Sequence, residues 1–296
     1  MAAKKLHDGE VDIDAALVRR LLDRQFPDYR GLPVREIQST GTVNAIYRLG
    51  DDLCVRVPRV ERWAGDLDKE LEWLPKLAAQ LTVAIPEPVA QGEPDRDYPF
   101  RWAIYRWLTG ATFATDPVVH DHRAATDLAQ FVTELRQIDP TAAPQSGRYP
   151  LQDLDVLTRN AIDKLRDVID TDATTAVWEQ SLHAPAWDGI PVWRHGDLLT
   201  PNLLVEHGQL KAVIDFGTVG IGDPAADVIP GWSVFGPRGR QAFRDAVAVD
   251  EGTWARARGY ALHQAVLIIP YYAETNPGFV AAAMRSVQHV LADTDV

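Results

Sequence analysis

The chain has 296 residues, of which 46% are hydrophobic, and its 30 basic and 42 acidic side chains give a formal net charge of −12. This length and apolar content predict one or two globular domains with a hydrophobic core. The basic residues are dispersed along the chain, which argues against nucleic acid as a partner because phosphate contacts require clustered Lys and Arg.

The single cysteine, Cys54, excludes an intramolecular disulfide and any zinc or iron–sulfur site built from several cysteines, which fits a reducing compartment. Charged residues are interspersed among the N-terminal 16 positions, where a signal peptide would need an unbroken apolar segment. The most apolar stretch, 265–272, is much shorter than the ~20 residues that span a bilayer. We therefore expect a cytoplasmic protein without membrane contact.

The first part of the chain predicts a small antiparallel sheet with two helices. Acidic residues precede Leu17, Val18, Leu21 and Leu22, whose spacing predicts an amphipathic helix that ends before Phe26. A second helix is expected over 66–81, with a kink or a break near Trp73 because Pro75 removes a backbone donor. Segments with β character lie at 34–38, 45–49, 53–57, 88–92 and 100–108.

From residue 121 onward, helical periodicity dominates. Helices are expected over 121–137, 151–169, 174–183, 223–235, 241–249, 253–273 and 277–291. Short apolar strands are expected between them at 191–194, 203–206 and 210–214. The sequence therefore predicts a β-rich N-terminal domain (1–107) and a helical C-terminal domain (108–296).

The negative charge is concentrated in the second predicted domain. Residues 1–107 hold 16 basic against 18 acidic side chains, a charge of −2, whereas residues 108–296 hold 14 against 24, a charge of −10. A solvated surface explains this charge, because net charge mainly affects solubility and steering. A cleft that attracts a cationic substrate explains it as well.

Two short segments carry the strongest chemical signal. His195-Gly196-Asp197 is followed by Asn202, and Asp215-Phe216-Gly217 comes after an intervening hairpin. The hairpin predicts that Asp197, Asn202 and Asp215 converge at one of its ends. Carboxylate and amide oxygens suit Mg²⁺, and phosphoryl transfer needs a carboxylate for the attacking hydroxyl and metal ligands for the phosphates. Each residue alone has an ordinary explanation as a turn, a cap or a core histidine, but the combination favours chemistry.

The pattern H-G-D-x-x-x-x-N followed by D-F-G resembles the aminoglycoside phosphotransferase family, which has a protein-kinase-like fold. The resemblance spans about residues 38–227. It implies an α+β, bilobal architecture: an antiparallel sheet lobe with a helix, then a larger, mostly helical lobe. It also implies ATP or GTP as phosphate donor, Asp197 as the catalytic residue, and Mg²⁺ held by Asn202 and Asp215.

The resemblance extends to the predicted nucleotide side. Arg56, on the third predicted strand, stands where the best-known members have a phosphate-binding lysine, and arginine can also pair with phosphate. Glu70 corresponds to the ion-pairing glutamate, and His195 and Asp227 correspond to residues that support the catalytic loop. The remaining nucleotide-binding candidates are the phosphate-covering loop Ser39, Thr40, Gly41 and Thr42 and the adenine-binding hinge Arg106, Trp107 and Leu108.

The acceptor is the least specified partner. Aminoglycosides are polycations, and the charge of −10 suits one; the candidate lining residues are Asp153, Asp155, Trp232, Tyr271, Tyr272 and Glu274. The two aspartates are also explained as helix caps and the aromatic residues as core. A kinase for a macrolide, a peptide antibiotic, a sugar or an amino alcohol is an alternative. So is a nucleotide-binding pseudokinase, although the complete catalytic set argues against it. The sequence does not specify an oligomeric state.

Overall fold

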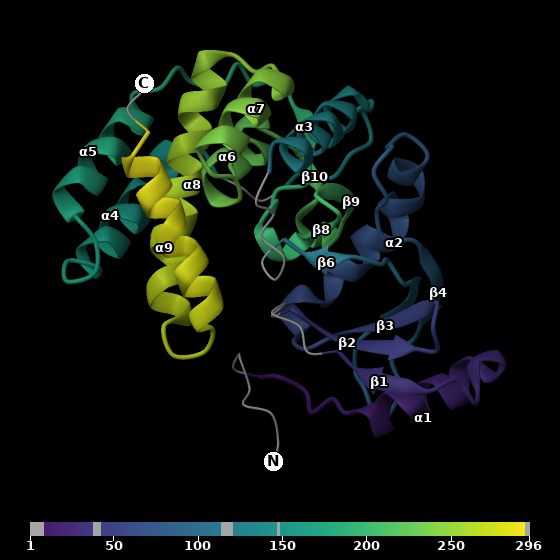
Figure 1. Cartoon of the computed structure of the whole chain (residues 1–296). Coiled ribbons are helices and arrows are strands. Elements are labelled where there is room, and N and C mark those ends of the chain that lie inside the picture. The colour runs from purple at the N-terminus through teal and green to yellow at the C-terminus, as the bar shows by residue number, and fades with distance from the viewer. Residues whose placement is uncertain (1–8, 38–42, 114–120, 147–148, 294–296) are drawn as a thin grey trace. The chain divides into compact units, whose positions relative to one another are not determined.

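The computed structural model describes residues 9–37, 43–113, 121–146 and 149–293 (Figure 1). The chain divides into two compact units. The first unit contains the described residues of Met1–Ala79, Ala84–Thr109 and Ile214–Gly217, and the second those of Gln80–Val83, Gly110–Val213 and Thr218–Val296. The segment 214–217, which includes Asp215, thus packs with the sheet-bearing unit, although it follows a strand of the other unit.

The first unit is a five-stranded antiparallel sheet with two α-helices. Its elements are α1 (Ala15–Gln25), β1 (Val34–Glu36), β2 (Asn44–Leu49), β3 (Leu53–Pro58), α2 (Ala64–Ala78), β4 (Pro88–Gly92) and β5 (Trp102–Arg106). The strand order is β1-β2-β3-β5-β4. The expected helix over 66–81 starts two residues earlier, and it continues through Pro75 without a break at Trp73.

One face of this sheet packs against α1. The Asp14 carboxylate accepts from the Leu17 N–H at 2.7 Å and so caps the helix. The apolar face of α1 forms a buried core with alternate residues of the strands: Leu17, Val18, Leu21, Leu22, Ala45, Tyr47, Leu49, Val55, Val57, Trp102 and Ile104. Because successive side chains in a strand point to opposite faces, the pleat that buries Val55 and Val57 against α1 places Arg56 on the other face.

The second unit is mostly helical. Its helices are α3 (His122–Gln137), α4 (Asp155–Asp163), α5 (Thr171–Leu182), α6 (Pro230–Ser233), α7 (Pro237–Val247), α8 (Glu251–Tyr272) and α9 (Pro277–Leu291). Its strands form two small antiparallel sheets, β6 (Ala111–Thr112) with β8 (Leu203–Glu206) and β9 (Gln209–Val213), and β7 (Val192–Arg194) with β10 (Gly220–Gly222). Within the described residues, no helix is long and apolar enough to cross a membrane.

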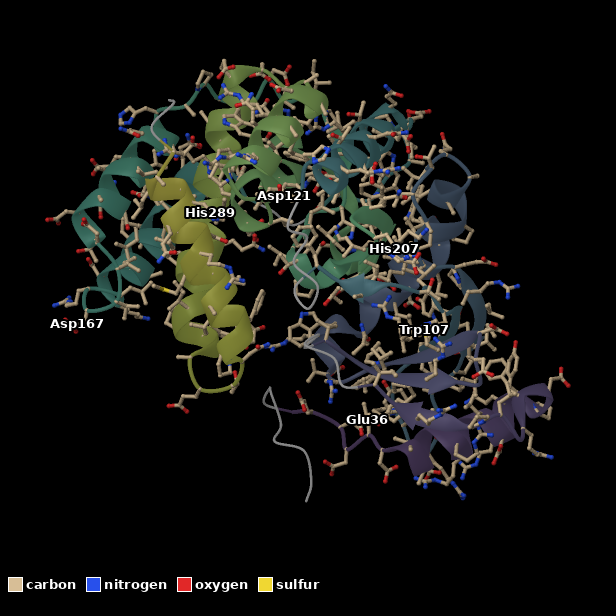
Figure 2. All side chains as sticks on the ribbon, viewed as in Figure 1. Glu36, Trp107, Asp121, Asp167, His207 and His289 are labelled. Atoms are coloured by element: carbon tan, nitrogen blue, oxygen red, sulfur yellow. The ribbon has the colours of Figure 1, made fainter. Side chains whose placement is uncertain are left out.

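Two expected helices of the second unit are shorter than predicted. The segment 151–169 forms the 3₁₀ turn η3 (Leu151–Leu154) followed by α4, and 223–235 forms η6 (Pro224–Asp227) followed by α6. Pro224 and Pro230 each begin one of the latter elements, since proline fits a first turn but not a helix interior. The hairpin between β8 and β9 turns at His207, labelled in Figure 2, and Gly208, with φ of 50° and 78°. Such left-handed angles are typical of two-residue hairpin loops.

Gly92 provides a test of the packing at the sheet edge. A Cβ atom at this position would collide with the buried indole of Trp102, its partner across the β4–β5 ladder. We expect Gly92→Ala to lower the free energy of unfolding by about 1–3 kcal/mol. Gly65→Ala in α2 is the matched control, because a Cβ there meets nothing within 4 Å, and alanine favours helix. Urea unfolding measures both; equal stabilities would contradict the close approach of Gly92 to Trp102.

Candidate functional site

Arg56 on β3 lies at the centre of a buried ionic cluster in the first unit. Its Nη1 is 2.7 Å from Oε2 of Glu70 on α2, and its Nη2 is 3.4 Å from Oδ1 of Asp215. The guanidinium carbon lies 5.3 Å from the centroid of the Tyr105 ring, and the Tyr105 hydroxyl donates to Glu70 at 3.0 Å. One cation thus joins a strand, a helix and the segment after β9.

The environment of this cluster shifts several pKa values. Burial acts to lower the pKa of Arg56, but the charges of Glu70, Tyr105 and Asp215 outweigh it and raise that pKa above its ordinary value. Burial raises the pKa of the Glu70 carboxyl, while the Arg56 charge opposes this. Glu70 Oε1 is buried and has no hydrogen-bond partner in the described part of the chain. Arg56 therefore stays cationic.

Asp215 is held in an uncommon backbone conformation. Its φ is 68°, in the left-handed region that a non-glycine residue rarely adopts and that often marks functional positions. Phe216 is fully buried, and Lys69 Nζ donates to the Gly217 carbonyl. The Asp215 side chain is 36% exposed. Its neighbours are thus fixed, while its carboxylate remains accessible.

The loop after β7 in the second unit is fixed by Asp227. The Asp227 carboxylate, 1% exposed, accepts from the backbone N–H of His195 at 2.6 Å and of Gly196 at 2.7 Å. Thr218 Oγ1 donates to the His195 carbonyl at 2.7 Å. Gly196 has φ of 84°, and a Cβ there would lie 3.1 Å from Nη1 of Arg194. This position therefore requires glycine.

Amide groups contact both oxygens of the Asp197 carboxylate. Asn202 Nδ2 donates to Asp197 Oδ2 at 3.0 Å and to the Asp197 carbonyl at 2.9 Å. Gln264 Nε2, from α8, lies 3.3 Å from Asp197 Oδ1. Sequence reasoning missed Gln264, because a glutamine inside an apolar helix carries no motif and lies 67 positions from Asp197.

Taken separately, each unit offers oxygen donors of the kind that Mg²⁺ prefers when substrate oxygens complete its coordination. The Asn202 amide nitrogen faces Asp197, so its carbonyl oxygen points away from that carboxylate as a possible ligand. In the first unit, Glu70 and Asp215 outweigh the single charge of Arg56, so added positive charge is favourable there. No group of three His, Cys, Asp or Glu side chains gathers as a metal site among the described residues. Mg²⁺ in phosphate sites commonly uses only one or two carboxylates.

The predicted hinge residues follow β5. The N–H of Arg106 donates to the Glu87 carbonyl at 2.9 Å, and the N–H of Trp107 to the Asp52 carbonyl at 2.8 Å. The guanidinium of Arg48 lies 4.0 Å from the centroid of the Trp107 ring, which Figure 2 labels. Leu108 is half-buried. Of the remaining nucleotide candidates, Ser39, Thr40, Gly41 and Thr42 lie outside the described residues.

The six acceptor candidates differ in their exposure and in their contacts. Asp153 is exposed in η3. Asp155 accepts from Arg159 Nε and Trp178 Nε1, each at 2.7 Å, and these contacts lower its pKa, with the Trp178 bond as the largest cause. Tyr271 is 59% exposed and its ring centroid lies 4.7 Å from that of Tyr272.

Glu274 is exposed after α8. Trp232 corrects our expectation: it is fully buried, its ring lies 4.6 Å from that of Trp254, and its Nε1 donates to Asp293 at 2.7 Å. Since no surface of Trp232 reaches solvent, this residue belongs to the core and does not line an acceptor site.

The sequence and the fold were compared with those of known proteins. "Uncharacterized protein YcbJ" of Bacillus subtilis (strain 168) is 24% identical in an alignment over 178 residues that covers 55% of this chain; this chain spans only 56% of that protein's own length. The structure of the GDP and kanamycin complex of APH(2")-IIIa aligns with a TM-score of 0.74 at 21% identity, covering 94% of this chain and 99% of that one.

A second solved structure, the apoenzyme of the macrolide 2'-phosphotransferase MphH from Brachybacterium faecium, aligns with a TM-score of 0.60 at 21% identity, covering 92% of this chain and 97% of that one. These alignments confirm the expected α+β, protein-kinase-like fold. Residues 34–260, more than half of the chain, match the sequence model of the Phosphotransferase enzyme family. The chain belongs to the Phosphotransferase enzyme family.

Proposed function

We propose that the protein is a small-molecule kinase that transfers the γ-phosphoryl group of ATP or GTP to an alcohol group of its acceptor. The observation that carries this proposal is the Asp197 carboxylate, oriented by Asn202 on a loop that Asp227 fixes through two backbone bonds. The Asp197 side chain therefore has a defined orientation, and the backbone of its loop does not need to rearrange before the reaction. Such preorganisation supplies much of the rate enhancement in phosphoryl transfer.

In the proposed step, the acceptor hydroxyl oxygen forms a bond to the γ-phosphorus as the bond from that phosphorus to the β,γ-bridging oxygen breaks. The hydroxyl proton passes to the Asp197 carboxylate, and the nucleoside diphosphate leaves with the bridging-bond electron pair. A nearby carboxylate that accepts the proton of the attacking hydroxyl is the role that this chemistry requires. Atoms and charge therefore balance without an additional reactant.

The first unit supplies the nucleotide side of the reaction. Arg56, buried and cationic, is suited to pair with phosphate oxygens, and Glu70 holds its guanidinium in place. We assign Asn202 and Asp215 as ligands of Mg²⁺, which supplies positive charge to the phosphates when bound. Because the N–H groups of Arg106 and Trp107 are committed within the protein, we expect Leu108 and hinge carbonyls to contact the base.

For the acceptor we propose an antibiotic-like polyol, with a cationic aminoglycoside as the first candidate to test. Its support is the charge of −10 over residues 108–296 and the similarity in fold to an enzyme solved with kanamycin. The solved macrolide phosphotransferase has the same sequence identity to this chain, 21%, which supports a macrolide as the second candidate. A panel of kanamycin, erythromycin and simple sugars, each with ATP and GTP, tests both: ³¹P NMR detects the phosphorylated acceptor.

Asp197→Asn tests the proposed base. The amide keeps the shape of the side chain but cannot accept the hydroxyl proton, so we expect kcat to fall by about 10²- to 10⁴-fold. Nucleotide affinity, measured by calorimetric titration, should stay nearly unchanged. Asp188→Asn is the matched control, because Asp188 is an exposed aspartate whose carboxylate accepts one hydrogen bond, from the backbone N–H of Ile190. Equal losses of rate and of nucleotide affinity in Asp197→Asn would argue against a base.

Glu70→Ala tests the ionic cluster. It leaves the buried Arg56 guanidinium without its closest counter-ion, and removing one partner of a buried pair costs about 3–5 kcal/mol of unfolding free energy. Nucleotide affinity should also fall, because Arg56 is no longer held. The control is Glu72→Ala in the same helix, whose side chain is 58% exposed and paired with the exposed Lys76; it should change stability by less than ~1 kcal/mol. Urea unfolding and nucleotide titration distinguish the two variants.

Asp227→Asn tests the support of the catalytic loop. Asparagine offers one acceptor oxygen for two buried N–H groups, so one of them faces an amide donor. We expect a loss of about 1–3 kcal/mol in unfolding free energy, and a lower kcat from a loop that is no longer fixed. Thermal unfolding and steady-state kinetics measure these effects. A variant that keeps full kcat despite the lost stability would show that loop fixation does not limit catalysis.

A further inference from the structure

Gln264 connects the long helix α8 to the catalytic loop within the second unit. Its Nε2 lies 3.3 Å from Asp197 Oδ1, the oxygen that Asn202 does not contact. An acceptor hydroxyl that gives its proton to this oxygen must therefore approach next to the Gln264 side chain. The polarity of the α8 surface beyond Gln264 is therefore expected to influence which acceptor can bind.

Beyond Gln264, a row of half-buried or exposed side chains lies along one side of α8, while the exposed Pro270 and the half-buried Tyr272 lie outside this row. Gln264, Leu267 and Ile268 are half-buried and Tyr271 is 59% exposed. Their spacing of 3, 4 and 7 positions from Gln264 places them on one face of an α-helix. The intervening residues Ala265, Val266 and Ile269 are buried on the opposite side. We call Gln264, Leu267, Ile268 and Tyr271 the α8 stripe.

Apart from Gln264, the α8 stripe consists of aliphatic and aromatic side chains, and further tyrosines follow and precede it. Tyr271 contacts Tyr272, whose ring centroid lies 5.2 Å from that of Phe279 on α9. One turn before Gln264, the hydroxyl of the buried Tyr260 donates to the carbonyl of Tyr149 at 3.1 Å, and the Tyr149 side chain is 64% exposed. Exposed aromatic and aliphatic side chains beside a reactive group commonly line ligand sites.

The α8 stripe carries no charge. Its four residues are uncharged. Of the acidic acceptor candidates, Asp155 is paired with Arg159 and bonded to the Trp178 indole, and Glu274 is exposed three positions beyond Tyr271. The stripe itself therefore carries none of the charge of −10 over residues 108–296, and Glu274 is the acidic candidate that follows it in sequence. A polycation would leave its ammonium groups unpaired against Leu267 and Ile268, which is costly.

We propose that the α8 stripe is the acceptor-facing surface beside Asp197, and that it takes an acceptor whose reactive hydroxyl lies on an apolar framework. This inference rests on the proposed function and, on the polarity of the stripe, favours its second acceptor candidate, a macrolide, over the polycationic first candidate. Gln264 is a positioning residue: it donates to Asp197 Oδ1, so that with Asn202 the carboxylate is held from both oxygens. Leu267, Ile268 and Tyr271 then contact the apolar framework of the acceptor.

Charge introduced into the stripe tests its polarity. Erythromycin, whose hydroxyls lie on an apolar framework, should bind and accept phosphate, and Leu267→Asp and Ile268→Asp should each raise its KM by about 10-fold or more. The milder Ile268→Ala should raise this KM in the same direction without a folding defect. Val168→Asp is the matched control, because Val168 is 53% exposed and follows Asp167, which Figure 2 labels in the turn after α4; it should leave KM unchanged.

The outcome with a polycation separates the acceptor class from the proposed function. Transfer to kanamycin in preference to erythromycin, with KM insensitive to the Leu267 and Ile268 variants, would overturn the apolar stripe and leave the kinase intact. Erythromycin binding that the stripe variants abolish, measured by calorimetry, without phosphate transfer under any condition would instead overturn the kinase. Nucleotide affinity equal to that of the unmodified protein verifies that each variant is folded.

Two substitutions of Gln264 separate positioning from a structural role. Gln264→Glu keeps size and helix propensity, so a residue that only builds the helix surface tolerates it. If Gln264 orients Asp197, a second carboxylate at 3.3 Å repels the first, and kcat should fall by more than in Gln264→Ala while the nucleotide dissociation constant is unchanged. A Gln264→Glu enzyme with unchanged kcat would refute positioning.

Discussion

The ion pair between Arg56 and Glu70 is the interaction on which the proposed nucleotide side depends. It joins the central strand β3 to α2, and through the second guanidinium nitrogen to Asp215, 159 positions away in the chain. Because the Arg56 and Glu70 side chains are buried, neither can move without leaving the charge of the other unpaired. The pair therefore stabilises the position of Asp215 as well as that of the guanidinium.

In the second unit, neutral amide groups rather than a cation contact the Asp197 carboxylate. A carboxylate that serves as a base must be oriented without being permanently neutralised by a cation. Asn202 and Gln264 contact Asp197 through amide nitrogens, and the loop itself is fixed by backbone bonds to Asp227. The charged Asp227 thus binds the backbone of the loop, whereas the neutral amides of Asn202 and Gln264 contact the Asp197 carboxylate. This arrangement leaves the carboxylate able to accept a proton in the proposed reaction.

The sequence predicted the local parts of this arrangement well. Asp197 and Asn202 are five positions apart, and the alternation of buried residues around Arg56 follows from strand geometry alone, so a motif and a pleat suffice to place them. Gln264 could not be predicted, because its contact depends on how α8 packs. Trp232 has the same sequence signature whether it is core or ligand-stacking, and only its packing on Trp254 distinguishes them. The roles assigned to the site residues remain predictions.

Arginine in place of lysine at position 56 also affects how the protein can be studied chemically. A nucleotide analogue that carries an acyl phosphate or a sulfonyl fluoride is an electrophile, and it reacts with an unprotonated amine such as that of lysine. A guanidinium whose pKa the surrounding carboxylates raise further has no unprotonated nitrogen to react at neutral pH. Such reagents are consequently poor probes of Arg56, and an enzyme of this kind would go undetected in a survey that relied on labelling this position.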